Sequence, residues 1–290
     1  MSVLFFCVGA AKAGTSWLYS QLAEHPECHF RAIKELHYFD AVDDGKLERE
    51  LRKHQGQQAR ILNNVAASGN TPSDDQARRL TDRAAWMDVL EQGEDTEAYL
   101  GYLNHDAGDA KVVGDITPGY ALLSETRFRT MSKLAGDVRF LMLLRDPVER
   151  LWSHVRMIAA RRDDSGTATA ERCDRILKRT IRGKEDQIAK RSNYAVTIER
   201  LMAAVPGGKL LIEVFEEMVS GEGLARICAH LGIAPIVPNL ARLHAGQHVA
   251  MTQDQRRAAA HWLAPQYEAS AKALGRMPEA WMRKGQDDGR

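Results

Sequence analysis

The stretch that decides the fold is Val3-Leu-Phe-Phe-Cys-Val8, followed by Gly9-Ala-Ala-Lys12-Ala-Gly14-Thr15-Ser16. An apolar run, a loop of small residues and a helix-like stretch from Trp17 onward predict a strand, an anion-binding turn and a helix. The glycines are spaced as in a phosphate-binding P-loop, but the lysine stands inside the loop and not beside the hydroxyl. We therefore expect the loop to hold a phosphate-like group, although not the β,γ-phosphates of ATP in the usual way. A tight turn without a ligand is the structural alternative.

Further apolar runs bounded by turn residues indicate buried strands at 111–117, 138–144 and 209–215. Helical patterns lie at about 16–24, 122–134, 148–161, 195–204, 219–231 and 252–274. This alternation predicts an α/β, P-loop-like, three-layer fold in which helices flank a central, mostly parallel sheet. A chain of 290 residues is most economically one domain, 1–290. The polar and charged residues 41–110 are interpreted as an insertion that caps the sheet.

The composition excludes several functional classes. The chain is 44% hydrophobic and 27% charged, as ordinary soluble globular proteins are. A net charge of +1 argues against nucleic acid as a partner, and no run reaches the roughly 20 apolar residues of a membrane span. The four cysteines have neither Cys-x-x-Cys nor metal-ligand spacing, which favours reduced thiols, a cytoplasmic location and no metal site. The sequence leaves the oligomeric state open.

Residues 156–191 carry a local excess of positive charge, with eleven Lys and Arg residues against six Asp and Glu residues. A solvated helical face explains such an excess, and so does contact with an anionic substrate.

A second motif, Leu144-Arg145-Asp146-Pro147, comes at the end of a predicted strand and the start of a predicted helix. Arg145 should therefore emerge at the carboxyl edge of the sheet, where open α/β sheets bind ligands. Ser153 follows about two turns into the helix and could face the same crevice. A guanidinium with a hydroxyl is suited to a phosphate. Pairing of Arg145 with Asp146 or Glu149 is the structural alternative.

A third motif is Lys34-Glu35-Leu36-His37-Tyr38-Phe39-Asp40. In an extended segment Glu35 and His37 point to one face, and Leu36 and Tyr38 point to the other. A carboxylate beside an imidazole can take a proton from a hydroxyl and orient it. An ordinary polar strand edge would have the same pattern.

Taken together, these motifs resemble those of the sulfotransferases that use 3′-phosphoadenosine 5′-phosphosulfate (PAPS). The nearest branch contains the heparan sulfate O- and N-sulfotransferases and their bacterial relatives. The loop from Lys12 to Tyr19, with His25-Pro26 downstream, resembles the 5′-phosphosulfate loop of that family. The motif from Leu144 to Ser153 is similar to its 3′-phosphate motif, and Glu35 to Asp40 looks like its catalytic-base segment. Asp115-Ile-Thr117-Pro118-Gly-Tyr120 resembles the family segment that lines the acceptor cleft.

The resemblance implies a role for each matching residue. Lys12 would stabilise the leaving group, Glu35 would be the general base and His37 would orient the acceptor, with His37 as base the nearest alternative. The implied donor-binding residues are Lys12, Ala13, Gly14, Thr15, Ser16, Trp17, Arg145, Ser153, Gly246 and His248. The implied acceptor-binding residues are His37, Asp40, Thr117, Pro118 and Tyr120.

The resemblance also implies the reaction: the sulfuryl group of PAPS passes to a hydroxyl or amine, and adenosine 3′,5′-bisphosphate is the product. Glu-x-His favours a carbohydrate or glycoconjugate acceptor, while a small natural product or a peptide tyrosine stays open. The chain departs from the heparan-type pattern at Ile116, where a basic residue is frequent, and at 244–248, where the cofactor-covering loop is usually rich in Lys and Arg. The rival classes are a P-loop kinase or GTPase and a catalytically silent nucleotide-binding module.

Overall fold

The computed structural model describes residues 2–69, 71–242 and 249–286, and its centre is a five-stranded sheet. The strand order is β2-β3-β1-β4-β5, and all neighbouring strands are parallel. The strands are β1 (Val3–Gly9), β2 (Cys28–His29), β3 (Val112–Ile116), β4 (Val138–Leu144) and β5 (Leu210–Val214). The predicted α/β fold with a parallel sheet flanked by helices is confirmed. The four predicted strands form, and the short edge strand β2 is an addition.

The two central strands are apolar along almost their whole length because both faces of the sheet are covered. Every residue of β1 is buried, and so is every residue of β4 except Arg139. Parallel strands need crossover connections, which place helices on the faces of the sheet and remove the alternation of polar and apolar residues.

The first half of the chain contributes α1 (Thr15–Leu22), α2 (Tyr38–Asp43), α3 (Leu47–Ser68), α4 (Asp74–Glu91), α5 (Thr96–Asn104), the 3₁₀ turn η1 (Pro118–Leu122) and α6 (Glu125–Met131). The second half contributes α7 (Pro147–Arg161), α8 (Ala170–Ile181), α9 (Asp186–Ser192), α10 (Tyr194–Ala204), α11 (Phe215–Ser220), α12 (Glu222–Leu231), the 3₁₀ turn η2 (Leu240–Arg242), α13 (Gln253–Leu274) and α14 (Glu279–Gln286). Each predicted helical segment contains a helix. The segment 219–231 holds the end of α11 and all of α12, which meet at Gly221 with a φ of 107°.

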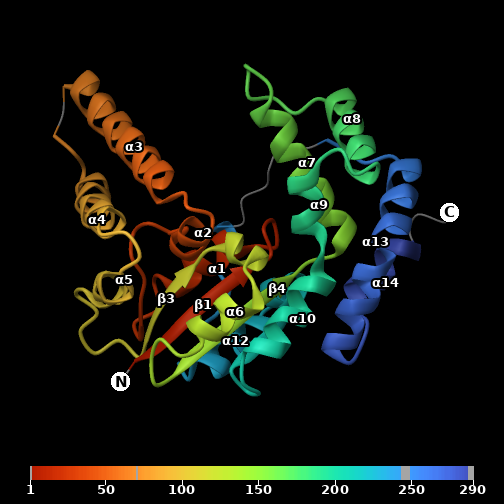
Figure 1. Cartoon of the computed structure of the whole chain (residues 1–290). Helices are drawn as coiled ribbons and strands as arrows, with labels where there is room; N and C mark the ends of the chain where they lie inside the picture. Colours follow the sequence, from red (N-terminus) through yellow and green to blue (C-terminus); the bar gives the residue numbers. More distant parts are fainter. Residues whose placement is uncertain (1, 70, 243–248, 287–290) are drawn as a thin grey trace.

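The polar segment 41–110 is largely helical, and α3 and α4 pair as a hairpin that projects from one side of the molecule (orange in Figure 1). Trp86 of α4 and Tyr99 of α5 are fully buried in the main hydrophobic core, so this segment packs against the sheet through its second half. Its description as a capping insertion within a single domain stays a prediction.

A second hydrophobic cluster lies beside the main core and joins α7, α8 and α13 (green and blue in Figure 1). Leu151 and Val155 of α7 meet Cys173 of α8 and Leu263 of α13 within it. The cluster fixes the direction in which α7 leaves the carboxyl end of β4.

Candidate functional site

The loop between β1 and α1 has the backbone of an anion-binding turn. Lys12 has a φ of 73° and Gly14 a φ of 85°, and α1 begins at the next residue, Thr15. A side chain at position 14 would collide with Phe215, since its Cβ would lie 2.3 Å from a ring carbon. Left-handed backbone and close packing together explain why glycine stands there. The loop thus directs backbone amides and the start of a helix toward the carboxyl end of the sheet.

Lys12 lies in a strongly basic environment. Burial lowers the pKa of its ammonium, and the charges of Arg145, Arg161 and Arg156 lower it further, while Glu35 acts in the opposite direction. Cations gathered around a partly buried lysine repel one another unless an anion lies among them. The loop and α7 therefore form a site that favours a multiply charged anion.

Arg145 follows β4 directly, as predicted, and its side chain contacts the loop between β1 and α1. Its Nη1 donates to the carbonyl oxygen of Lys12 at 3.3 Å, and its guanidinium lies 5.1 Å from the centre of the Phe215 ring. Its Nε is buried and has no hydrogen-bond partner among the described residues. The alternative pairing with Glu149 exists, but at 3.9 Å it leaves hydrogen-bonding capacity free. Ser153 is partly exposed on α7, and no described contact joins it to Arg145.

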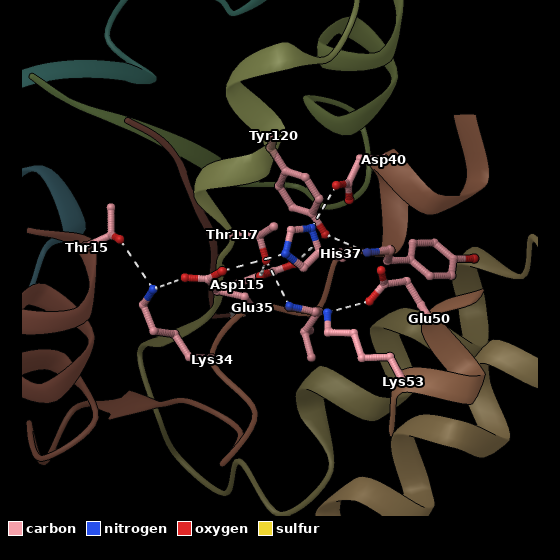
Figure 2. Close-up of polar contacts among 12 residues, drawn as sticks. Thr15, Lys34, Glu35, His37, Asp40, Glu50, Lys53, Asp115, Thr117 and Tyr120 are labelled. Carbon is pink, nitrogen blue, oxygen red and sulfur yellow. Dashed lines mark hydrogen bonds and ion pairs between the residues drawn. The ribbon is translucent and has the colours of Figure 1, made fainter. Parts of the chain in front are cut away.

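Glu35, His37 and Asp40 form a connected group of charges (Figure 2). His37 Nδ1 lies 2.7 Å from Asp40 Oδ2, and its Nε2 lies 3.6 Å from Glu35 Oε2. Burial alone would lower the pKa of His37, but the hydrogen bond with Asp40 and the ion pair with Glu35 outweigh it and raise the pKa to about 9. His37 is therefore charged at neutral pH and carries a carboxylate on each side.

The segment that holds this group differs from an extended strand, although its side chains alternate as predicted. Leu36 and Tyr38 are buried and Glu35 is exposed, but His37 has a φ of 55° and precedes α2. The left-handed backbone at His37 directs the chain into α2, and this turn brings the carboxylate of Asp40 next to the imidazole of His37.

Lys34 is a site residue to which the sequence analysis gave no role. Its Nζ donates to Thr15 Oγ1 at 3.3 Å and to Glu35 Oε1 at 2.6 Å, and its side chain is 16% exposed (Figure 2). The ammonium therefore joins the phosphate-type loop to the proposed base. Its position immediately before Glu35 was the only signal for it in the sequence.

Asp115 supports the segment from Glu35 to Asp40, called the base segment after its expected role. It is buried at the end of β3 and accepts hydrogen bonds from Tyr99, Thr117 and Tyr120 at 2.9, 2.6 and 2.7 Å. Burial raises its pKa to about 6, against the lowering effect of these three hydroxyls.

The hydroxyls of Thr117 and Tyr120 in turn accept from the backbone N–H groups of Leu36 and Tyr38, at 2.9 and 3.1 Å. Thr117, Pro118 and Tyr120 were predicted to line the acceptor cleft. All three are buried, and the hydrogen bonds that the structure gives to the hydroxyls of Thr117 and Tyr120 are with Asp115 and with the backbone of the base segment. Contact of these residues with an acceptor stays a prediction.

A cleft of about 1390 Å³ opens beside His37 and Asp40. One wall comes from α2 and the start of α3, and the other comes from α9 and α10. The lining residues are charged with both signs: Asp40, Asp43, Asp44, Glu50 and Glu94, and Lys46, Arg49, Arg127, Lys190, Arg191 and Arg200. The site is therefore open to a polar molecule on the side of His37 that faces away from the loop.

The remaining predicted residues fall into two groups. Ala13 and Trp17 are buried and Ser16 is exposed, and Trp17 Nε1 donates to the carbonyl of Asn239 at 2.9 Å. Gly246 and His248 lie outside the described residues.

Two further observations concern the described part of the chain only. No cluster of three or more His, Cys, Asp or Glu side chains is placed there to hold a metal ion. None of the helices in the same part combines the length and apolar character needed to cross a membrane.

Comparison with known proteins gives one family and several structural relatives. The model of the sulfotransferase family matches residues 5–238. None of the curated proteins compared with the chain matches it in sequence.

Among solved structures, a sulfotransferase from Alicyclobacillus acidocaldarius is 21% identical, with a TM-score of 0.65 over 96% of this chain and 98% of that one. The sulfotransferase domain of the Synechococcus PCC 7002 olefin synthase is 18% identical, with a TM-score of 0.51 over 90% of this chain and 94% of the domain. The sulfotransferase domain of the curacin biosynthetic pathway is 15% identical, with a TM-score of 0.52 over 96% of this chain and 98% of the domain. At these identities the likeness concerns the fold.

Proposed function

Because the chain belongs to the sulfotransferase family, we propose that it transfers the sulfuryl group of PAPS to a hydroxyl or amine of an acceptor. The observation that carries the proposal is the pair of contacts made by Lys34. Its ammonium reaches Thr15 of the phosphate-type loop and the carboxylate of Glu35, so an anion site and a proton acceptor are one side chain apart. Sulfuryl transfer needs that proximity because the attacking and leaving oxygens lie in line.

The donor side of the site fits the charges of PAPS. Backbone N–H groups of 14–16 and the hydroxyls of Thr15 and Ser16 would hold the 5′-phosphate, and Lys12 would face the bridging oxygen. The N–H of Ala13, also expected to bind the donor, donates to the carbonyl oxygen of Ala10 at 3.1 Å and would have to exchange that partner. Arg145 and Ser153 would hold the 3′-phosphate, and the buried Nε of Arg145 without a hydrogen-bond partner supports this assignment. A tetra-anionic ligand would also relieve the repulsion between Lys12 and the arginines around it.

Glu35 is the proposed general base, and His37 is proposed to orient the acceptor. His37 is protonated at neutral pH, with a pKa of about 9, so it holds no free lone pair to receive a proton. Glu35 is ionised under the same conditions, since its pKa is lowered to about 2 by His37 and Lys34 against the opposing effect of burial. The assignment of His37 as base, open from the sequence, is thereby disfavoured.

The proposed acceptor is a carbohydrate or glycoconjugate. The Glu-x-His segment favours it, and a large cleft lined by charged and amide side chains suits a polyhydroxylated molecule. A small natural product or a peptide tyrosine is the alternative acceptor, and a panel of acceptors distinguishes them.

Binding and transfer test the proposal separately. In calorimetry, adenosine 3′,5′-bisphosphate should bind at least about tenfold more tightly than ATP, because Arg145 gains a charge-assisted contact with the 3′-phosphate. Labelled PAPS should then deliver sulfate to sugar hydroxyls in a panel that also contains phenols, tyrosine peptides and amines. Equal binding of ATP would favour a kinase-like protein, and binding without transfer to any acceptor would favour a silent nucleotide-binding module.

A further inference from the structure

The side chain of Lys34 connects the loop with Glu35 by two hydrogen bonds. Figure 2 shows its ammonium between Thr15 and Glu35, with His37 and Asp40 beyond the carboxylate. The contact with Glu35 is short, 2.6 Å, and the contact with Thr15 is longer, 3.3 Å. The Lys34 side chain is 16% exposed and the Glu35 side chain is 43% exposed, so the ammonium is mostly shielded while the carboxylate is open on one side.

The carboxylate of Glu35 has several positive neighbours on different elements. Lys34 and His37 lie on its own segment, Lys12 lies on the loop after β1, and Arg191 lies on α9. Asp40 is the negative neighbour that faces it through the imidazole. Among these cations Lys34 makes the shortest contact, and it is also the one whose ammonium touches the loop.

A carboxylate held this strongly is a weak base. The pKa of Glu35 is about 2, and proton transfer from a hydroxyl is more favourable when the pKa of the base is nearer the working pH. The free protein therefore holds its proposed base in an unreactive state, and a change at Lys34 is the most direct way to alter it.

We propose that Lys34 is a positioning residue shared between donor and base: in the free protein it holds the Glu35 carboxylate, and an anionic donor at Thr15 draws the ammonium toward the loop. The inference rests on the proposed function, because it takes Thr15 to adjoin the 5′-phosphate and sulfate oxygens. These oxygens offer the ammonium more negative charge than the hydroxyl of Thr15 does. Glu35 then loses its shortest ionic contact at the moment when the donor is in place.

The reaction balances with Glu35 in this role. Glu35 takes the proton of the acceptor hydroxyl, the acceptor oxygen bonds to sulfur, and the bond from sulfur to the bridging oxygen breaks. The electron pair of that bond leaves with adenosine 3′,5′-bisphosphate, whose developing charge faces Lys12. Lys34 transfers no proton and forms no bond.

Carbon-13 NMR of the Glu35 carboxyl group tests, without turnover, whether donor binding weakens the contact between Lys34 and Glu35. In the wild-type protein, adenosine 3′,5′-bisphosphate should raise the pKa of this carboxyl by about one to three pH units, the usual effect of one close opposite charge. In Lys34→Met the carboxyl should start from a higher pKa and rise less on binding, since only direct repulsion by the ligand remains. Lys34→Arg, which retains the charge, should behave as the wild type does.

The control is Lys178→Met, because Lys178 is an exposed lysine on α8 that pairs with Asp174. It should reproduce the wild-type titration in both states. Equal rises in wild type and Lys34→Met would overturn the role of Lys34, and so would an unchanged Glu35 pKa in the wild-type complex. Absence of adenosine 3′,5′-bisphosphate binding would instead contradict the proposed function itself, so the two failures are distinct.

Kinetics give a second readout on the same variants. With labelled PAPS, the pH profile for kcat of the wild-type protein gives an apparent pKa for its acid limb. This apparent pKa should be higher than the pKa of Glu35 measured in the free protein. In Lys34→Met the two should nearly coincide. A merely structural role for Lys34 would lower kcat uniformly across pH and leave that difference unchanged.

Discussion

The charge of His37 separates the two possible roles of the imidazole. Its pKa is raised from 6.5 to about 9, because the hydrogen bond with Asp40 and the ion pair with Glu35 overcome the effect of burial. Protonation therefore contributes stability that is fully present below pH 6.5 and is lost as the pH rises through about 9. An orienting, charged imidazole loses its function over that range, whereas a general base would gain it.

We predict that kcat/KM for the acceptor falls as the pH rises through about 9, and that His37→Asn removes this limb and raises the acceptor KM. The measurement is the rate of transfer from labelled PAPS between about pH 6 and pH 10. His105→Asn is the matched control, because the exposed imidazole of His105 pairs with the neighbouring Asp106. A rate that increases through pH 9 in the wild type would make His37 the base.

At the scale of elements, the end of β3 acts as the support of the base segment. Asp115 accepts from three hydroxyls, two of which also receive the backbone N–H groups of the base segment. The position of Glu35 and His37 therefore depends on a buried carboxylate that touches neither of them in the described contacts.

Asp115→Asn should lower the free energy of unfolding by about 2 kcal/mol, because an amide NH₂ cannot accept from a hydroxyl and a buried donor loses its partner. Transfer activity should fall further than donor affinity, since the base segment shifts while the loop does not. Urea denaturation and calorimetry measure the two effects. Asp109→Asn, an exposed change in the turn before β3, should leave both unchanged, and equal behaviour of the two variants would refute the role of Asp115.

The sequence predicted the apolar strands but missed several helices, among them α8, which buries Cys173, Ile176, Leu177 and Thr180 at helical spacing. The four predicted strands are apolar runs and formed as expected, whereas β2 pairs with β3 through only two residues and has no pattern of its own. The helix α3 was missed because it is polar and buries only His54, and α4 was missed because its buried apolar residues Trp86, Val89 and Leu90 are confined to its last turns.

In the site, the residue types were predictable and their contacts were not. Arg145 emerges at the edge of the sheet because Pro147 starts α7 directly after β4, which a local pattern encodes. The left-handed backbone of His37 and the reach of Lys34 to Thr15 depend on α1 and β3 lying beneath the base segment. Such contacts join parts of the chain that are distant in sequence, so spacing alone could not show them.

At the scale of the whole molecule, the segment that matches the family model does not contain the complete core. The match ends at residue 238, but α13 buries Leu263 against α7 and α8, and Trp281 of α14 is 4% exposed. Trp281 Nε1 donates to Glu216 at 3.0 Å, and Glu216 also accepts from the N–H of Asp146, next to Arg145. The final helices therefore contribute to the edge of the proposed donor site.

Trp281→Ala should reduce the free energy of unfolding by about 3 kcal/mol, the usual cost of removing a buried tryptophan side chain. Chemical denaturation provides the measurement. Met282→Ala is the adjacent control, since Met282 is 48% exposed, and it should change stability by less than about 0.5 kcal/mol. Identical midpoints for the two variants would mean that α14 contributes nothing to the stability of the fold.

The α3–α4 hairpin has a thermodynamic consequence for the cleft beside His37 and Asp40. Of the 22 residues of α3 only His54 is buried, so little apolar surface opposes its separation from the molecule. Lys46, Arg49 and Glu50, which line the cleft, stand at the start of this helix. Local unfolding of the far end of α3 therefore requires less free energy than global unfolding. The cleft wall at the start of the helix is different, because Leu47 and Leu51 pack there against the main core. The two ends of α3 should thus exchange their amide hydrogens at different rates, with the wall of the cleft more protected than the tip of the hairpin.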